Sequence, residues 1–247
     1  MSKLSIVIPV YNEEHLLAAA FARMAAVSYG IEVEFIMVDD GSTDNSWAVM
    51  EELCHQHSSL RLLRHLTNEG KGAALHSGIA AATGDIIAIQ DADLEYDPVD
   101  LIRLIEPLVQ NRTDVVYGSR FAAGRPRGYS LFRYLVNRGL TAYSNIMSGL
   151  ALSDMETCQK VFRADLLQRL PLTSRRFGFE PEVTARLAQL NVRIQEVPIS
   201  YNPRHYAEGK KIGWRDGLAA LWFIWTFNRR PLSLREMEAI PACYRKS

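Results

Sequence analysis

The stretch DIIAIQDADLE, residues 85–95, decides how the rest of the sequence is interpreted. Its first part, Asp85–Gln90, is mostly apolar and β-branched, which is typical of a buried strand. Three acids then follow at alternate positions, Asp91, Asp93 and Glu95. Alternate residues of a continuing strand share one face, so these carboxylates are expected to point the same way.

Carboxylates crowded at a strand end repel one another unless a cation lies between them. Hard oxygen ligands suit Mg²⁺ or Mn²⁺, which keep open positions for substrate phosphates. Asp91, Asp93 and Glu95 are therefore the expected metal ligands. A solvated acidic turn before Pro98 is the competing interpretation, because a short pair of aspartates is common.

Other apolar runs alternate with segments of helical periodicity around this strand. Strands are expected at Leu4–Val10, Glu34–Asp39, Leu60–Arg64, Asp85–Gln90 and Asp114–Tyr117, and helices at Glu13–Val27, Thr43–His57, Lys71–Ala82 and Pro98–Gln110. The alternation predicts an α/β fold with a mainly parallel sheet and helices on both faces. In such a sheet, ligands bind at the carboxyl ends of the strands.

The second half follows a different pattern. Helices are expected at Leu131–Gly149, Pro181–Leu190 and Trp214–Phe227, with a short strand at Gln159–Arg163, an extended segment at Ile194–Tyr201 and a loop at Asn202–Gly213. We expect one domain over residues 1–228, with a nucleotide half (1–121) and an acceptor half (122–228) that join at Gly124–Gly128. Residues 229–247 are expected to form a C-terminal tail.

Composition and charge exclude several classes of protein. The 247 residues carry 28 basic and 28 acidic side chains, so net charge gives no reason to expect nucleic acid as a partner. Three scattered cysteines disfavour a disulfide framework, and the histidines of the first half, His65 among them, lack ligand spacing and are expected on the surface. Met1–Val10 does not resemble a signal peptide, and Gly217–Phe227 is too short to span a bilayer. We therefore expect a cytoplasmic protein.

The first two strands end in polar stretches at the expected ligand edge. Tyr11 can stack on a base, and Glu13 or Asp40 can accept a hydrogen bond from a base edge or a ribose hydroxyl. Helix capping is the competing interpretation, and it explains Asn12 and Ser42 better than Tyr11 or Asp40.

Lys71 lies between glycines at the start of a predicted helix, where it can serve a diphosphate. It does not belong to a P-loop, because the GxxxxGK[ST] pattern is absent. Taken alone, this stretch is better explained as a plain loop.

Five motifs that are weak alone become specific in combination. They are Pro9-Val10-Tyr11-Asn12-Glu13, Asp39-Asp40-Gly41-Ser42-Thr43-Asp44, Asn68-x-Gly70-Lys71-Gly72, Asp91-Ala92-Asp93 and Gly118-Ser119-Arg120-Phe121. In this order they resemble the GT-A glycosyltransferases of family 2. Further stretches, Asp154–Arg163, Phe177–Glu182, Glu196–Tyr201 and Arg204–Gly217, are similar to the dolichyl-phosphate and polyprenyl-phosphate mannose synthases. The resemblance extends to about residue 225.

The resemblance implies a Rossmann-like GT-A fold and a set of site residues. The implied donor-binding residues are Pro9, Tyr11, Glu13, Val38, Asp40, Lys71, Asp91, Ala92, Asp93, Arg120, Arg204 and Lys210, and the implied catalytic residues are Asp93, Arg120 and Arg133. Arg120 would face the reaction centre and Arg133 would hold the acceptor phosphate. Arg204 and Lys210 would close over the phosphates. One departure is Glu95, because mannose synthases usually carry Gln there.

The resemblance also implies an inverting transfer from a donor such as GDP-mannose or UDP-glucose. A lipid monophosphate is already ionised near neutral pH and needs cations instead of a general base. Arginines are frequent early in the second half, at positions 120, 125, 127, 133 and 138. This favours a polyprenyl-phosphate acceptor. A hydroxyl acceptor would need a carboxylate base, for which Glu180 and Glu182 are the candidates.

A polyprenyl acceptor lies in a bilayer, so the enzyme must reach a membrane surface. The aromatic and aliphatic residues that could lie in the interface are Leu131, Phe132, Leu135, Tyr143, Leu218, Leu221, Trp222, Trp225 and Phe227, with Arg229 and Arg230 toward headgroups. Packing on the sheet is the competing interpretation for the inward residues. We expect a peripheral enzyme at the inner face of the membrane.

Two other classes of protein share part of this pattern. A nucleotidyltransferase is disfavoured, because Tyr11-Asn12-Glu13 stands where a glycine-rich loop with a basic residue is expected. A non-catalytic sugar-nucleotide-binding protein stays open, although the intact acidic and basic motifs argue against it.

Overall fold

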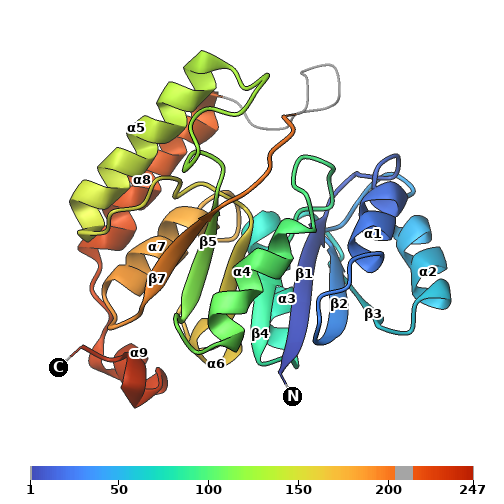
Figure 1. The fold of residues 1–247 in the computed structure, drawn as a ribbon, viewed down its shortest axis with the longest axis horizontal. Helices are drawn as coiled ribbons and strands as arrows, with labels where there is room; N and C mark the ends of the chain where they lie inside the picture. The colour runs from blue at the N-terminus through green and yellow to red at the C-terminus, as the bar shows by residue number, and fades with distance from the viewer. Residues whose placement is uncertain (1, 204–213, 247) are drawn as a thin grey trace.

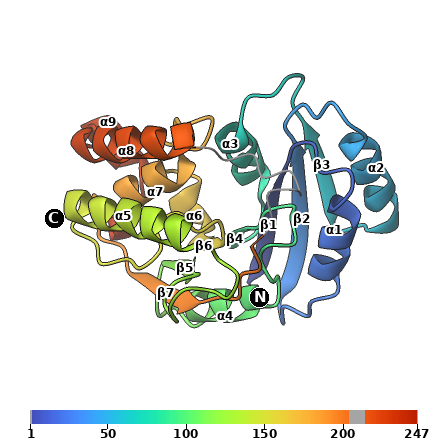
Figure 2. The ribbon, with the colours of Figure 1, turned by 90° about the horizontal axis from the view of Figure 1, so that it is seen from above.

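A computed structural model describes residues 2–203 and 214–246. Arg204, Lys210 and the expected loop around them lie outside the described residues. In the described part, seven strands form one sheet in the order β3-β2-β1-β4-β6-β5-β7, with helices on both faces (Figures 1 and 2). The strands are β1 (Lys3–Val10), β2 (Glu32–Asp39), β3 (Leu60–Arg64), β4 (Ile86–Ile89), β5 (Val115–Ser119), β6 (Lys160–Arg163) and β7 (Ile194–Pro198).

The mainly parallel sheet predicted for the first half is confirmed. β1 pairs in parallel with β2 and β4, and β2 pairs in parallel with β3. Successive side chains of a strand enter opposite faces. Ile6 and Ile8 of β1 therefore join one core cluster, under the helices α1, α2 and α4, whereas Val7 joins the cluster on the other face, under α3, α6 and α7.

The helices cover residues close to the predicted ranges. Their bounds are α1 (Leu17–Ala25), α2 (Ser46–Gln56), α3 (Lys71–Ala81), α4 (Asp100–Val109), α5 (Leu131–Ser148), α6 (Ala164–Leu167), α7 (Phe179–Ala188), α8 (Trp214–Arg229) and α9 (Leu234–Ala239).

The starts of α1 and α2 differ from the capping interpretation. Asn12 has a left-handed φ of 52°, and its side chain accepts a hydrogen bond from the Thr43 amide at 2.8 Å. Ser42 Oγ accepts in turn from the Asn12 amide at 3.0 Å. Both side chains therefore join the loops after β1 and β2, and α1 begins only at Leu17.

The acceptor half is not a separate layer, because it adds strands to the same sheet. β6 lies antiparallel between β4 and β5, and β7 pairs in parallel with β5. Residues far apart in sequence thus share one core. This arrangement brings the segment before β6 next to the loop after β4.

The C-terminal residues pack on this core. Ile240 is fully buried and Tyr244 nearly so, and both join the cluster under α3, α6 and α7. The Tyr244 carbonyl accepts a hydrogen bond from the Asn191 amide at 2.8 Å. This packing favours the interpretation that residues 229–247, which we expected to form a tail, belong to the domain.

Helices α5 and α8 run side by side at one end of the molecule (Figures 1 and 2). Leu140 of α5 and Ala220 and Ile224 of α8 form a small buried cluster between them. The outward apolar residues are Leu131, Phe132, Leu135, Leu218, Leu221, Trp222 and Trp225. Phe227 and Tyr143, which we expected at an interface, pack inward instead. No helix among the described residues combines the length and apolar character needed to cross a bilayer.

Candidate functional site

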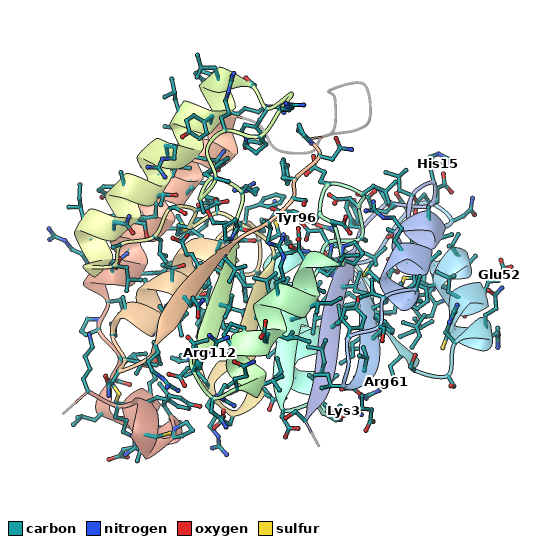
Figure 3. All side chains as sticks on the ribbon, viewed as in Figure 1. Lys3, His15, Glu52, Arg61, Tyr96 and Arg112 are labelled. Carbon is teal, nitrogen blue, oxygen red and sulfur yellow. The ribbon has the colours of Figure 1, made fainter. Side chains whose placement is uncertain are left out.

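The candidate site lies at the carboxyl ends of the parallel strands. β1, β2 and β4 end at Val10, Asp39 and Ile89, and the expected site residues follow in the loops. Tyr96 lies at this edge, whereas Lys3 and Arg61 lie at the opposite edge of the sheet (Figure 3).

The acidic stretch after β4 is a turn and not a continuing strand. β4 ends at Ile89, and Asp93 Oδ1 accepts a hydrogen bond from the Glu95 amide at 3.0 Å. The Glu95 carboxylate accepts one from the Tyr201 hydroxyl at 2.8 Å. The expected continuation of the strand through these acids is therefore wrong, because the backbone bends after β4, so strand alternation does not set the directions of the carboxylates.

Across residues 2–203 and 214–246, no three Asp, Glu, His or Cys side chains are placed so that they could hold a metal ion together. The expected trio of Asp91, Asp93 and Glu95 is thus not assembled. A smaller protein contribution still fits, since Mg²⁺ is commonly bound by one or two carboxylates together with substrate phosphates and water. Asp91 and Asp93 supply oxygen ligands of the required hardness.

Lys71 joins the acidic loop to the acceptor half. Its Nζ lies 2.9 Å from Asp91 Oδ1, 3.3 Å from Glu180 Oε1 and 3.1 Å from Cys158 Sγ. Burial alone would lower the pKa of Lys71, but the charges of Asp91, Cys158 and Glu180 raise it well above its ordinary value. Lys71 is therefore a cation at the site, where it balances Asp91 and Glu180.

The start of α3 is covered by protein instead of being open to a phosphate. The amides of Gly72 and Ala73 donate to the carbonyls of Arg176 and Arg175 at 3.2 and 2.9 Å. A Cβ on Gly72 would lie 2.1 Å from the Ser174 carbonyl oxygen, so the two segments pack too closely for any side chain. These two amides of the first turn of α3 therefore already donate hydrogen bonds within the protein.

Asp40 is nearly fully buried and organises the loop before α3. Its carboxylate accepts hydrogen bonds from the amides of Glu69 and Gly70 at 3.0 and 2.7 Å, and from Asn68 Nδ2 at 2.9 Å. It also contacts His65 Nδ1 at 2.8 Å.

His65 itself is a residue that sequence reasoning placed on the surface. Its second nitrogen, Nε2, lies 2.8 Å from Ser77 Oγ, so the ring bridges Asp40 to α3. No sequence spacing predicts this contact, because it joins the loop after β2, the loop after β3 and helix α3. Asp40 and His65 together fix the loop before α3.

The other residues that the resemblance assigns to donor binding differ in how exposed they are. Val38 and Ala92 are buried, and the Val38 side chain lies in the core against α3, which leaves only its backbone for a ligand. Pro9, Tyr11 and Glu13 are half-buried at the strand end, where a base can reach them.

Arg120 is held by Asp154. Its Nε and Nη2 lie 2.7 and 2.8 Å from the two Asp154 oxygens, and its backbone amide donates to the same carboxylate at 3.0 Å. The guanidinium also lies over the Tyr201 ring, 5.3 Å from its centroid. Burial would lower the pKa of Arg120, but the charge of Asp154 raises it well above its ordinary value. Sequence reasoning missed Asp154 as the residue that orients Arg120.

Arg133 lies on the first turn of α5 and is half-buried. Burial raises the pKa of Tyr129, and the charges of Arg120 and Arg133 both oppose that rise. The two arginines therefore act on one tyrosine, which lies against the Tyr201 ring with centroids 5.6 Å apart. Tyr129 and Tyr201 also link the arginines to Glu95.

The two candidate base residues have different surroundings. Glu182 is fully buried and accepts hydrogen bonds from the Thr173 and Ser174 amides at 2.9 and 2.7 Å, so it fixes the loop before α7. Glu180 is paired with Lys71.

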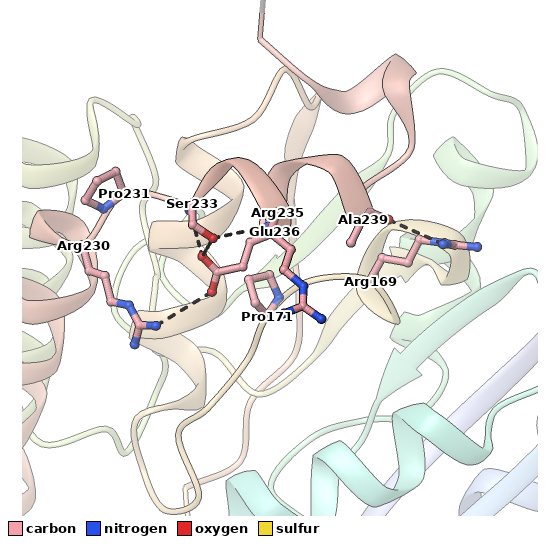
Figure 4. A pocket seen from close by; sticks show the side chains of 8 residues that line it. All are labelled: Arg169, Pro171, Arg230, Pro231, Ser233, Arg235, Glu236 and Ala239. Carbon is pink, nitrogen blue, oxygen red and sulfur yellow. Dashed lines mark hydrogen bonds and ion pairs between the residues drawn. The ribbon is translucent and has the colours of Figure 1, made fainter.

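A surface hollow of about 520 Å³ lies elsewhere, beside α9 (Figure 4). Arg230 pairs there with Glu236 at 3.8 Å, and Ser233 and Glu236 cap α9. α9 lies away from the carboxyl ends of the strands (Figure 1), so this hollow is separate from the site described above.

The sheet gathers acidic and basic side chains at its carboxyl edge, which is where open α/β sheets bind their ligands. Residues 5–170 match the family model described as Glycosyl transferase family 2. The chain belongs to this family and is a glycosyltransferase.

Two curated relatives illustrate the likeness. The chain is 31% identical over 234 residues to the undecaprenyl-phosphate mannosyltransferase of Micrococcus luteus, covering 87% of this chain and 94% of that protein. It is 27% identical to the dolichol-phosphate mannosyltransferase of Pyrococcus furiosus, covering 85% of this chain but only 60% of that protein.

Another relative, the dodecaprenyl-phosphate galacturonate synthase of Rhizobium johnstonii, is 30% identical, and the chain covers 61% of it. Among solved structures, the glucosyl-3-phosphoglycerate synthase of Mycobacterium tuberculosis has a TM-score of 0.69 at 22% identity, covering 93% of this chain and 81% of that one. A second structure of that synthase contains Mn²⁺ and UDP and has a TM-score of 0.67 at 21% identity, covering 93% of this chain and 80% of that one. The predicted GT-A fold is confirmed.

Proposed function

We propose that this glycosyltransferase moves a hexose from GDP-mannose or UDP-glucose to a polyprenyl phosphate, with inversion at the anomeric carbon. One observation carries the proposal. Asp91 and Asp93 follow β4 at the same edge of the sheet as Arg120 after β5, and Arg133, on the first turn of α5, acts with Arg120 and Glu95 on Tyr129. The names of the mannosyltransferase relatives support the same acceptor.

On the donor side, the half-buried Tyr11 and Glu13 would hold the nucleoside, and Asp91 and Asp93 would hold Mg²⁺ or Mn²⁺ against the diphosphate. The ion, when bound, stabilises negative charge on the leaving nucleoside diphosphate. Lys71 keeps Asp91 oriented and holds a positive charge close to the diphosphate. The implied phosphate contacts of Arg204 and Lys210 belong to the same proposal.

On the acceptor side, Arg120 and Arg133 would bind the lipid phosphate. A phosphate monoester is already an anion near neutral pH, so it needs cations and no proton acceptor. Glu182 already accepts several hydrogen bonds and Glu180 is paired with Lys71, which disfavours either as a base. Asp154 limits the movement of Arg120 and so pre-positions it for the phosphate.

The membrane contact would lie on the exposed apolar residues at the start of α5 and along α8 as far as its middle. Phe132 and Trp222 are 75% and 61% exposed, and both helices begin at the end of the molecule where β1 and β2 terminate (Figure 1). Aromatic side chains on a helix surface partition into the headgroup region of a bilayer. The proposed enzyme is therefore peripheral, at the inner face of the membrane, and its lipid phosphate reaches the site from that side.

The first test uses a donor panel with a matched acceptor pair. GDP-mannose and UDP-glucose are each offered with a short polyprenyl phosphate and with the corresponding polyprenol, in Mg²⁺ and in Mn²⁺. We expect transfer to the phosphate, loss of transfer with a chelator, and none to the alcohol. Transfer to the alcohol alone would establish the hydroxyl-acceptor alternative.

The second test separates the donor and acceptor roles. Asp93→Asn is expected to lower kcat/KM by about a thousandfold, since charge stabilisation at the leaving group contributes several kcal/mol. Arg133→Ala is expected to raise the KM of the lipid phosphate at least about tenfold, while the donor Kd from calorimetry is unchanged. A protein that binds donor tightly yet never turns over would instead be a sugar-nucleotide sensor.

A further inference from the structure

The segment Asp154–Cys158 connects the two sides of the proposed site. Its first residue holds Arg120 through a two-point ion pair, and its last residue accepts a hydrogen bond from Lys71. Glu156 lies midway between these anchors in the sequence, and the charges that act on it include Arg120 on one side and Glu180, the partner of Lys71, on the other. A sugar held between the donor diphosphate and an acceptor phosphate at Arg120 would therefore lie next to Glu156.

Side-chain oxygens along this stretch are buried without partners. Glu156 Oε1, Thr157 Oγ1 and Gln159 Oε1 have no hydrogen-bond partner among the described residues. Buried oxygens are nearly always hydrogen-bonded, so three unpartnered ones within four residues make this stretch a candidate for a place where a ligand or water binds. Thr157 and Gln159 are fully buried, whereas Glu156 as a whole residue is half-buried although its Oε1 is covered, so its side chain extends from the core toward the surface.

The charges around Glu156 come from both halves of the site. Burial raises the pKa of Glu156 to about 7, and Glu180 and Asp154 add to the rise while Lys160 and Arg120 oppose it. Near neutral pH the carboxyl can therefore accept a hydrogen bond when ionised or donate one when protonated. A hydroxyl group suits both forms, whereas a carboxylate on the ligand suits only one.

We propose that Glu156 is a specificity-determining residue that hydrogen-bonds a hydroxyl of the donor sugar and disfavours sugars that carry a carboxylate. The inference rests on the proposed function, because it assigns the sugar to the space between Lys71 and Arg120. With Glu180 nearby, an acidic sugar would bring a third carboxylate to the same place. The names of the relatives include both mannose and galacturonate, so sugar charge is a property by which such proteins differ.

Two variants of the full chain separate the hydrogen bond from the charge. Glu156→Ala removes both, and Glu156→Gln keeps a hydrogen-bonding group without the charge. Glu52→Gln, on the exposed face of α2 far from Tyr96, is the matched control (Figure 3). Calorimetry gives the Kd for UDP, UDP-glucose and UDP-glucuronate, and for GDP, GDP-mannose and GDP-mannuronate.

We expect Glu156→Ala to weaken the neutral donor by about ten- to a hundredfold and to leave the bare nucleotide within about twofold. Glu156→Gln is expected to keep the neutral donor within a few-fold and to tighten the matching uronate by about tenfold. The control should change neither value.

Two results would overturn the inference. Equal weakening of nucleotide and nucleotide sugar in Glu156→Ala would make the residue structural. Unchanged donor binding with a loss in kcat of about a hundredfold or more would make Glu156 a general base for a hydroxyl acceptor. If wild type glycosylates no polyprenyl phosphate while Glu156→Ala still loses sugar binding selectively, the proposed acceptor is wrong and the inference stands.

Discussion

At the scale of single residues, buried carboxylates hold this structure together by accepting hydrogen bonds. Asp40 and Glu34 each accept several from segments distant in sequence, and Glu182 accepts several from the loop just before its own helix. The same residue type at Glu156 lacks such partners for one oxygen. Because an unsatisfied buried oxygen costs free energy, this contrast favours the proposed ligand-binding role of Glu156 over a purely structural one.

Glu34 gives a pH-dependent prediction at this scale. Burial would raise its pKa, but hydrogen bonds from Ser5 and from the Thr83 amide and hydroxyl lower it from 4.5 to about 2. A folded-state pKa below the unfolded value stabilises the protein above pH 4.5, and this stability is lost as the pH falls toward 2. Glu34→Gln should therefore lower the free energy of unfolding by roughly 3 kcal/mol at pH 7.

Urea unfolding of wild type and Glu34→Gln between pH 7 and pH 3 measures this difference. The gap between the two proteins should shrink as the pH falls. Glu52→Gln, at an exposed position on α2, should show no such gap. A gap that stays constant with pH would contradict an ionised Glu34 in the folded state.

At the scale of elements, α5 and α8 combine a narrow buried seam with a broad exposed apolar surface. Leu140 and Ile224 join the two helices, and Phe132 and Trp222 face outward. The hydrophobic periodicity in the sequence could not assign these faces, because aromatic residues lie on both sides of α8. Only contact with α5 and α7 shows which side is covered.

The double variant Phe132→Ser with Trp222→Ser should weaken binding to vesicles of anionic phospholipid by at least about tenfold, because two large apolar groups leave the interface. The melting temperature should stay within a few degrees, since both side chains are exposed. Leu234→Ser on α9, also at an exposed residue, is the control in the co-sedimentation assay. Equal vesicle binding by all three proteins would contradict the proposed membrane surface.

At the scale of the whole molecule, one sheet joins the two halves. β6, from the second half, separates β4 from β5, both of which come from the first half. The residues after 228 complete the core on one face through Ile240 and Tyr244. The halves should therefore unfold in a single cooperative transition.

Truncation after residue 228 tests this view. Loss of the buried Ile240 and Tyr244 side chains should lower the free energy of unfolding by at least about 3 kcal/mol. The comparison is made by urea denaturation against the full chain. Unchanged stability would show that the last residues form an independent tail.

The sequence by itself determined the parallel first half of the sheet, the order of the motifs and the family, because local periodicity and short motifs are properties of neighbouring residues. It did not determine the turn after β4, the partner of Arg120 or the bridge from Asp40 through His65 to Ser77. Those contacts join residues 12 or more positions apart, or depend on how the backbone leaves a strand. Only tertiary packing decides such geometry, since many chain segments compete for the same buried partners.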